Sequence, residues 1–380
     1  MGMWHLSLSY ALFLQIAKSA CEHVNYSPIM EILEGVLAAL FAPLLMTIGF
    51  FIWESVWIGS AFALNLTKCS MASVGFLFLS LITRSSNSSA PPLDPSRFAS
   101  DFIGWLILSS IIGILIGDLC WLEALGTIGA RRVILVDALN PFLAAVFAHF
   151  ILKDERAIDL IGYAGMVVTV VSVVIVSLEM STDNEKETLM TDENAADVEM
   201  VALDVTASAS PPISQPSSPP PRMTRGYILA FINVLFDVYG SVLTKQHGKQ
   251  FNTWEINLIR FGFASAVMML VAGLMHFRSR FTQHAKDQVE WFKIPNLDKP
   301  SWTKMFLGIF FVTFLCAGMR NYALFQIPLA VALTLGCVGP IYSLGLAIFY
   351  KKERISGKVA FFTILGCAGV VMLMFSSSAI

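Results

Sequence analysis

Ten stretches of this sequence are apolar and long enough to cross a lipid bilayer. The hydrocarbon core of a bilayer is about 30 Å thick, so a spanning α-helix needs roughly 20 mostly apolar residues. Only 14% of the 380 residues are charged, against about 25% in soluble domains. The sequence therefore predicts an all-α integral membrane protein with ten transmembrane helices, at about 33–53, 57–82, 102–125, 131–152, 157–178, 226–244, 253–276, 304–325, 328–350 and 357–377.

Two segments lie outside these spans. Residues 1–32 form an N-terminal segment, in which 3–17 is interpreted as an interfacial helix, with an eleventh span as the alternative. Residues 179–224 are first acidic and then rich in proline and serine. Such a composition cannot bury a hydrophobic core. A disordered linker is therefore predicted between two membrane domains, 33–178 and 225–377.

The two membrane domains repeat each other. The motif Asn65-Leu66-Thr67-Lys68 recurs 192 residues later as Asn257-Leu258-Ile259-Arg260. Further along, Ala124-Leu125 and Pro141 match Ala323-Leu324 and Pro340 at an offset of 199 residues. Each repeat has five spans, an odd number, so the second repeat must be inverted relative to the first. Inverted repeats with a binding cavity between them are a transporter architecture.

Both copies of the motif place a cation inside an apolar span. A charge at that depth costs several kcal/mol unless it is paired or hydrated, so such residues are usually functional. We interpret Lys68 and Arg260 as the groups that bind an anionic substrate, with Asn65 and Asn257, one turn earlier, as hydrogen-bond partners. The alternative is that both cations are neutralised by acids that also lie in spans, namely Asp118, Asp137 and Asp237.

A polar cluster lies in the fourth predicted span, where Asp137, Asn140 and Pro141 fall within about one turn. Proline lacks a backbone N–H and leaves a carbonyl free for other bonds. Asn140 is predicted to contact the substrate. Asp137 is a candidate proton site, cation site or partner of Lys68. Asp118 and Asp237 are likewise candidates for coupling or charge balance, or else for salt bridges between helices.

No motif points to catalysis or to a bound metal. The sequence has no H-E-x-x-H, G-x-S-x-G, P-loop or dinucleotide-binding signature. Its six cysteines form no C-x-x-C pair, and His149 has no second ligand at a suitable spacing. We therefore expect no catalytic residue, no metal and no cofactor. The expected partners are a small-molecule substrate and the lipid bilayer, without nucleic acid and with a homodimer left open.

The second half resembles the EamA repeat of the drug/metabolite transporter superfamily. The motifs that carry the resemblance are Asn321-Tyr322-Ala323-Leu324, Pro328-Leu329-Ala330, Pro340-Ile341 and Lys352-Glu353-Arg354-Ile355. The first half is similar through Ala124-Leu125, Ala130, Asn140-Pro141 and Asp154-Glu155-Arg156. Lys68 and Arg260 stand where that repeat often has a basic residue.

The resemblance implies ten helices and transport by alternating access, and it says little about the substrate. With the two cations inside the spans, we expect a secondary transporter of a small polar or anionic metabolite. The resemblance also implies that both termini are cytoplasmic. The distribution of loop lysines and arginines, among which Arg320 is counted, favours the opposite orientation. A function of another class remains as the alternative, a non-transporting membrane scaffold or signalling protein that acts through residues 179–224.

Overall fold

The computed structural model describes nine stretches of the chain, namely 27–53, 56–57, 59–87, 101–153, 159–178, 223–281, 291–346, the single residue 348 and 356–375. Within them, nine helices are long and apolar enough to cross a membrane, and Asn140–Ile151 is a shorter apolar helix. The predicted all-α multi-pass membrane fold is confirmed. The proposed interfacial helix at 3–17 and nearly all of the predicted linker lie outside the described residues.

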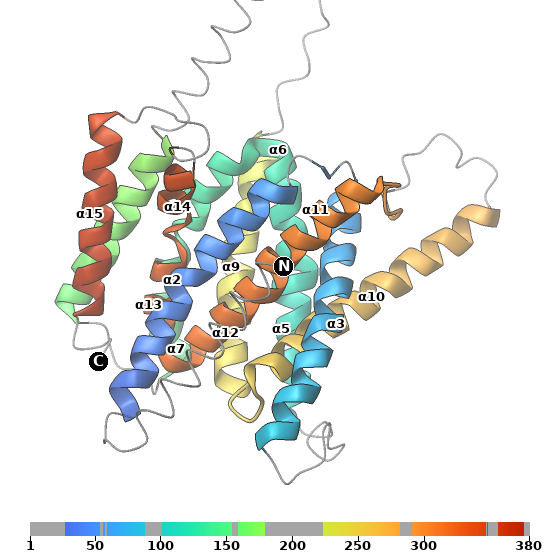
Figure 1. Cartoon of the computed structure of the whole chain (residues 1–380), viewed down its shortest axis with the longest axis horizontal. Helices are drawn as coiled ribbons and strands as arrows, with labels where there is room; N and C mark the ends of the chain where they lie inside the picture. The colour runs from blue at the N-terminus through green and yellow to red at the C-terminus, as the bar shows by residue number, and fades with distance from the viewer. Residues whose placement is uncertain are drawn as a thin grey trace, which may run out of the picture.

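The helices of the first repeat interleave with those of the second repeat in the bundle (Figure 1). They are α2 (Ser27–Trp53), α3 (Ala61–Asn87), α5 (Asp101–Ser110), the π-helix η1 (Ile111–Gly117), α6 (Asp118–Asp137), α7 (Asn140–Ile151) and a helix over Leu160–Leu178. The second repeat follows the same order. Its helices are α9 (Met223–His247), α10 (Thr253–Phe281), α11 (Lys299–Ile309), the π-helix η3 (Phe310–Leu315), α12 (Cys316–Gln326), α13 (Leu329–Gly336), α14 (Gly339–Leu346) and α15 (Gly357–Met374).

The turn between the third and fourth predicted spans lies within α6. The sequence analysis places a loop between a third span ending at 125 and a fourth span beginning at 131, and helical backbone continues through this region to Asp137. Trp121 Nε1 nevertheless lies 3.4 Å from Asp137 Oδ2, whereas a straight helix would separate these residues by about 24 Å. The chain therefore turns back sharply between them, and the fourth span consists of the end of α6 and the separate helix α7.

Packing between the halves follows the inverted repeat. Helix α6 packs on α9 as α12 packs on α2, while α3 faces its own counterpart α10, and α7 faces α13. In Figure 1, α2 begins at the lower end of the bundle, where α12 ends, whereas α9 begins at the upper end beside α6. Helices that contact their own counterparts must lie next to the pseudo-two-fold axis that relates the repeats.

Two glycines make this symmetry explicit. A Cβ added at Gly35 in α2 would collide with Gln326-Ile327, and one added at Gly226 in α9 would collide with Thr127-Ile128. The two glycines are 191 residues apart, and the residues that they contact are 199 residues apart. Each small residue lets two helices approach closely at one end of the bundle.

The last helix of each repeat also meets its counterpart through glycine. A Cβ at Gly165 would lie 2.7 Å from the backbone oxygen of Gly369, and a Cβ at Gly369 would lie 2.9 Å from that of Gly165. The helix Leu160–Leu178 therefore packs directly on the backbone of α15, beside which it lies in Figure 1.

Both repeats depart from regular helix at matching places. The π-helical segments η1 and η3 each interrupt the long third span, and such segments often occur at functional sites. The next span is broken in each half, after Asp137 with Pro141 following and after Gly336 with Pro340 following. Proline explains both breaks, because it cannot donate a helical hydrogen bond and clashes with the preceding turn.

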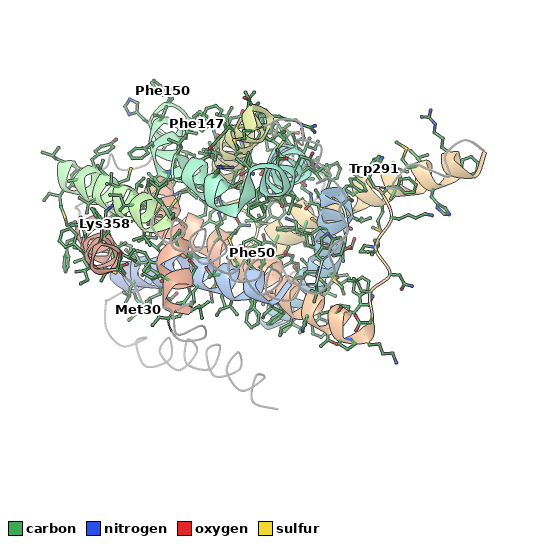
Figure 2. The ribbon with its side chains drawn as sticks, turned by 90° about the horizontal axis from the view of Figure 1, so that it is seen from above. Met30, Phe50, Phe147, Phe150, Trp291 and Lys358 are labelled. Carbon is green, nitrogen blue, oxygen red and sulfur yellow. The ribbon has the colours of Figure 1, made fainter. Side chains whose placement is uncertain are left out.

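The outer surface is apolar, as contact with lipid requires. In Figure 2 the side chains of Phe147 and Phe150 lie at the edge of the molecule, and Phe150 is 71% exposed. Phe50 lies in the interior, with its ring centroid 5.3 Å from that of Trp121. Polar and charged side chains that lie within the spans are therefore oriented toward other helices, which is where the site must be sought.

Candidate functional site

Six ionisable side chains from six different spans approach one another in the interior. Arg260 lies within electrostatic range of Asp237, Arg320 and Asp118. Asp137 lies within range of Asp237 and Arg320. We call these residues the central cluster, and its members are Lys68 (α3), Asp118 and Asp137 (the two ends of α6), Asp237 (α9), Arg260 (α10) and Arg320 (α12).

Lys68 and Asp118 form the first ion pair of the cluster. Lys68 Nζ lies 2.5 Å from Asp118 Oδ2, and the two side chains are only 7% and 28% exposed. The pair joins α3 to α6 immediately after the π-helical segment η1. The sequence analysis left three acids as candidate partners of Lys68, and in the structure its partner is Asp118.

Arg320 and Asp237 form the second ion pair, between α12 and α9. Their side chains are 42% and 24% exposed although both lie well inside apolar helices. Arg320 also lies within electrostatic range of Arg260 and Asp137. The pair therefore belongs to the same cluster as these two residues.

Arg320 is the member of the central cluster that the sequence analysis did not list among its candidate site residues. Counting it among the loop cations is wrong, because α12 continues for six residues after it, to Gln326. Its position inside the predicted span 304–325 was the signal that could have identified it. An arginine immediately before the motif Asn321-Tyr322-Ala323-Leu324 is no less costly inside a span than Lys68 is.

Arg260 is the cation of the cluster that has no acid beside it. The residue is 7% exposed, and in the described part of the chain its guanidinium makes no ion pair and its Nε has no hydrogen-bond partner. It lies against the π-helical segment η1, where a Cβ added at Gly113 would be 3.1 Å from Nη2. The sequence explains the missing acid, because the position that matches Asp118 at the 199-residue offset is Ala317.

Lys68 and Arg260 approach the centre from opposite faces of the membrane. Lys68 follows the start of α3 at Ala61 by seven residues, and Arg260 follows the start of α10 at Thr253 by the same number. At 1.5 Å per residue this is a depth of about 10 Å. Because the repeats are inverted, each cation is nearer to a different face.

The two asparagines of the duplicated motif are fully buried and hold helices together. Asn65 Nδ2 donates to the carbonyl of Ile114 in η1 at 3.1 Å. Asn257 Nδ2 donates to the carbonyl of Ala317, just after η3, at 3.5 Å, and its Oδ1 accepts from Asn321 at 2.5 Å. Each asparagine thus binds backbone beside a π-helical segment. That they also contact substrate stays a prediction.

The break between α6 and α7 carries two further polar side chains. Asp137 Oδ2 accepts a long hydrogen bond of 3.4 Å from Trp121 Nε1. The other carboxylate oxygen of Asp137 and the side-chain oxygen of Asn140 are buried without a donor among the described residues. At the matching break in the second half these two positions are Gly336 and Gly339.

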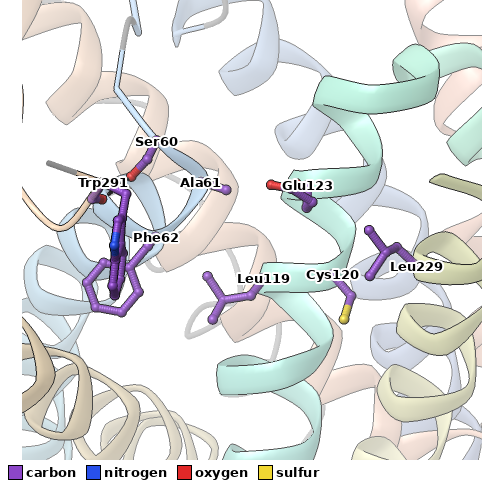
Figure 3. A pocket seen from close by; sticks show the side chains of 8 residues that line it. All are labelled: Ser60, Ala61, Phe62, Leu119, Cys120, Glu123, Leu229 and Trp291. Carbon is purple, nitrogen blue, oxygen red and sulfur yellow. Dashed lines mark hydrogen bonds between the residues drawn. The ribbon is translucent and has the colours of Figure 1, made fainter. Parts of the chain in front are cut away.

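A pocket of about 380 Å³ lies beside the Lys68–Asp118 pair (Figure 3). On α6 it is lined by Leu119, Cys120 and Glu123, which directly follow Asp118. Figure 3 shows Leu119 and Glu123 facing the start of α3 and Trp291, whereas Cys120 points toward Leu229. The remaining lining residues are Ser60, Ala61, Phe62 and Leu229. The pocket therefore lies between the upper end of the bundle and the central cluster.

The chain was compared with known protein families. The EamA-like transporter family matches residues 33–178 and 224–375, which covers both repeats. The chain belongs to the EamA-like transporter family. The members of this family are membrane transporters, and the resemblance seen in the sequence is confirmed.

Solved structures agree with this assignment at the level of the fold. A crystal structure whose description names no activity is 14% identical to this EamA-like transporter, with a TM-score of 0.59 over 89% of this chain and 96% of that chain. At that identity the likeness shows the fold alone. No curated protein matches the chain significantly. Among the described residues, no group of three or more His, Cys, Asp or Glu side chains could hold a metal ion.

The Lys68–Asp118 pair makes a testable contribution to stability. Asp118→Asn leaves a buried ammonium without its carboxylate, and breaking a buried pair in this way costs about 3 kcal/mol or more. We expect the free energy of unfolding in detergent micelles to fall by that amount. The double variant Lys68→Met/Asp118→Leu removes both charges and should recover most of the loss. A single variant as stable as the wild type would show that the pair is not a structural tie.

Proposed function

We propose that this chain is a secondary transporter of a small anionic metabolite, and that Arg260 binds the anionic group. The observation that carries this proposal is the unequal pairing of the three cations in the central cluster. Lys68 and Arg320 each have a carboxylate partner, whereas Arg260 has none among the residues that the structure describes. An uncompensated guanidinium is costly in an apolar interior, and a bound anion would remove that cost.

The chemistry of the guanidinium suits an anion with two or more oxygens. Its planar fork of N–H donors can make two parallel hydrogen bonds to one carboxylate or phosphate group. Gly113 supports this arrangement, because the absence of a side chain there gives the guanidinium room beside η1. Asn257 lies one turn before Arg260 and fixes α10 against the third span of its repeat, so it positions the cation.

Alternating access follows from the inverted placement of the two motif cations. Lys68 lies nearer to the face on which the pocket lies, and Arg260 lies nearer to the other face. An anion that enters through the pocket would first meet Lys68, whose ion pair with Asp118 it must loosen. A substrate that moves on to Arg260 reaches a cation accessible from the opposite side. The sequence carries no P-loop, so transport would use a gradient or exchange.

Counterflow in proteoliposomes tests this proposal. We expect the wild type to exchange at least one anionic metabolite from a panel of anionic, zwitterionic and cationic compounds. Arg260→Gln should lower that exchange at least tenfold, since hydrogen bonds to a charged group contribute about 1.5–3 kcal/mol. Arg260→Lys should lower the exchange rate less than Arg260→Gln does, because lysine keeps the positive charge and loses only the planar set of N–H donors.

The control is Lys304→Gln, which removes an exposed cation of α11 far along the chain from the cluster. It should exchange anions at the wild-type rate. Undiminished anion exchange by Arg260→Gln would contradict the proposed role of Arg260. Exchange limited to neutral or cationic compounds would contradict the proposed substrate class.

A further inference from the structure

The polar side chains at the break of the fourth span are not needed to make that break. The matching break in the second half forms after Gly336 and before Pro340, with glycine at both positions equivalent to Asp137 and Asn140. Proline alone therefore accounts for the change in direction. Broken spans at matching positions of two repeats are where transporters place their binding sites.

The two side chains present hydrogen-bond acceptors without donors. Asp137 Oδ1 and Asn140 Oδ1 are buried and lack a partner in the described part of the protein, and the bond from Trp121 to the other carboxylate oxygen is long at 3.4 Å. Arg320 is the cation that interacts electrostatically with Asp137, and it is already paired with Asp237. The break therefore holds a carboxylate oxygen and an amide oxygen that accept no hydrogen bond from the described residues.

A primary ammonium group matches these acceptors better than metal ions do. A proton on Asp137 would remove the negative charge and let the carboxyl donate to Asn140 Oδ1, so proton binding is the alternative that the substrate pairs below test. Calcium and magnesium need about six oxygen ligands, more than this break supplies. An ammonium group has three N–H donors and one positive charge, so it can bond to Asp137 and Asn140 together and balance the carboxylate.

We propose that the substrate is a zwitterion, whose ammonium group binds Asp137 and Asn140 while its anionic group binds Arg260. The proposal rests on the proposed function, because it takes Arg260 as the anion site. Asp237 and Arg320 interact electrostatically with both Asp137 and Arg260. The Asp237–Arg320 pair is therefore within electrostatic range of both proposed sites.

Matched substrate pairs test the ammonium site. Counterflow in proteoliposomes would be measured for glutamate against glutarate, aspartate against succinate, and taurine against ethanesulfonate, at one pH on both sides of the membrane. We expect the wild type to favour the amino compound of at least one pair by tenfold or more. Asp137→Asn should abolish that preference, and Asn140→Ala should reduce it. Without a gradient, a defect in proton coupling would leave the exchange unchanged.

The outcomes separate the two proposals. If the wild type exchanges the amine-free anions as well as the amino compounds, or Asp137→Asn keeps the preference, the ammonium site is overturned. Arg260-dependent exchange of the anions in that same experiment would leave the proposed function standing. If neither member of any pair is exchanged, both proposals fail.

A second inference rests on two polar contacts that the inverted repeat relates to each other. Arg225 Nη2 lies 3.2 Å from Glu123 Oε1, between α9 and α6. Tyr322 donates a hydrogen bond to Glu34, between α12 and α2. Glu123 matches Tyr322 at the 199-residue offset, and Glu34 matches Arg225 at the 191-residue offset. The same two offsets relate the contact of Gly35 with Gln326-Ile327 to the contact of Gly226 with Thr127-Ile128.

The two contacts lie at opposite ends of the bundle and differ in exposure. Arg225 and Glu123 are at the upper end of Figure 1, and their side chains are 54% and 47% exposed. Glu123 also lines the pocket of Figure 3. Glu34 and Tyr322 are at the lower end and are half-buried. Water weakens the upper ion pair, whereas the lower hydrogen bond is shielded.

The geometry points to these contacts as the two gates of the transporter. The shielded Tyr322–Glu34 bond holds α12 on α2 and keeps the lower face closed. The exposed Arg225–Glu123 pair holds α9 and α6 less firmly, so the pocket beside it is accessible. Opening of the lower face requires the first contact to break, and closing of the upper face tightens the second.

The thiol of Cys120 in the pocket reports this equilibrium. In a variant whose other cysteines are replaced by serine, the rate of labelling by a membrane-impermeant maleimide would be measured. Tyr322→Phe keeps the ring but removes the hydrogen bond, and we expect it to slow the labelling of Cys120 several-fold, because the lower face can open. Glu34→Gln should act in the same direction, and Glu123→Gln should not slow the labelling.

Labelling of Tyr322→Phe at the unchanged rate would overturn the gate assignment. Transport by that variant gives an independent readout, because a gate variant alters the exchange rate without altering which substrates compete. A change in substrate preference instead would show that Tyr322 belongs to the binding site.

Discussion

A charge inside a membrane protein must be paired, hydrated or bound by substrate, and this constraint organises the interior of the bundle. Six spans each bring one ionisable side chain to the central cluster. Four of these side chains form two ion pairs, which join α3 to α6 and α9 to α12. Arg260 and Asp137 are left outside these pairs, and they lie on spans that belong to different repeats. The proposed substrate is the molecule that supplies the two missing partners.

The fold depends on contacts that the two repeats share, whereas the proposed function depends on residues in which they differ. Glycine contacts, π-helical segments and proline breaks recur at matching positions, because both halves must pack in the same way. The motif cation recurs, as Lys68 and Arg260, but the acids around it do not. Asp118 matches Ala317, and Asp137 matches Gly336. The same divergence applies to the proposed gates, where Glu123 matches Tyr322. An ancestral symmetric bundle can acquire a directional site in this manner.

Much of this organisation could be predicted from the sequence, because apolar spans and duplicated motifs are local patterns. The ten predicted spans, the two repeats and five of the six members of the central cluster followed from such patterns. The pairing could not be predicted, since three acids were available to Lys68 and the choice depends on how α3 and α6 are rotated. Arg320 was missed because it was assigned to a loop. The turn between the third and fourth spans was predicted near its observed place, but the helical backbone that continues through it could not be predicted.

The central claim is that Arg260 is kept in the interior without a partner so that it can bind an anion. The most direct test compares the thermal unfolding of Arg260→Met with that of the wild type, in detergent and without substrate. Replacing an uncompensated buried charge with an apolar side chain of similar size should stabilise the protein by about 1–4 kcal/mol, although the variant would no longer bind anions. A less stable Arg260→Met would contradict the claim, because it would mean that Arg260 already has a partner on which the fold depends.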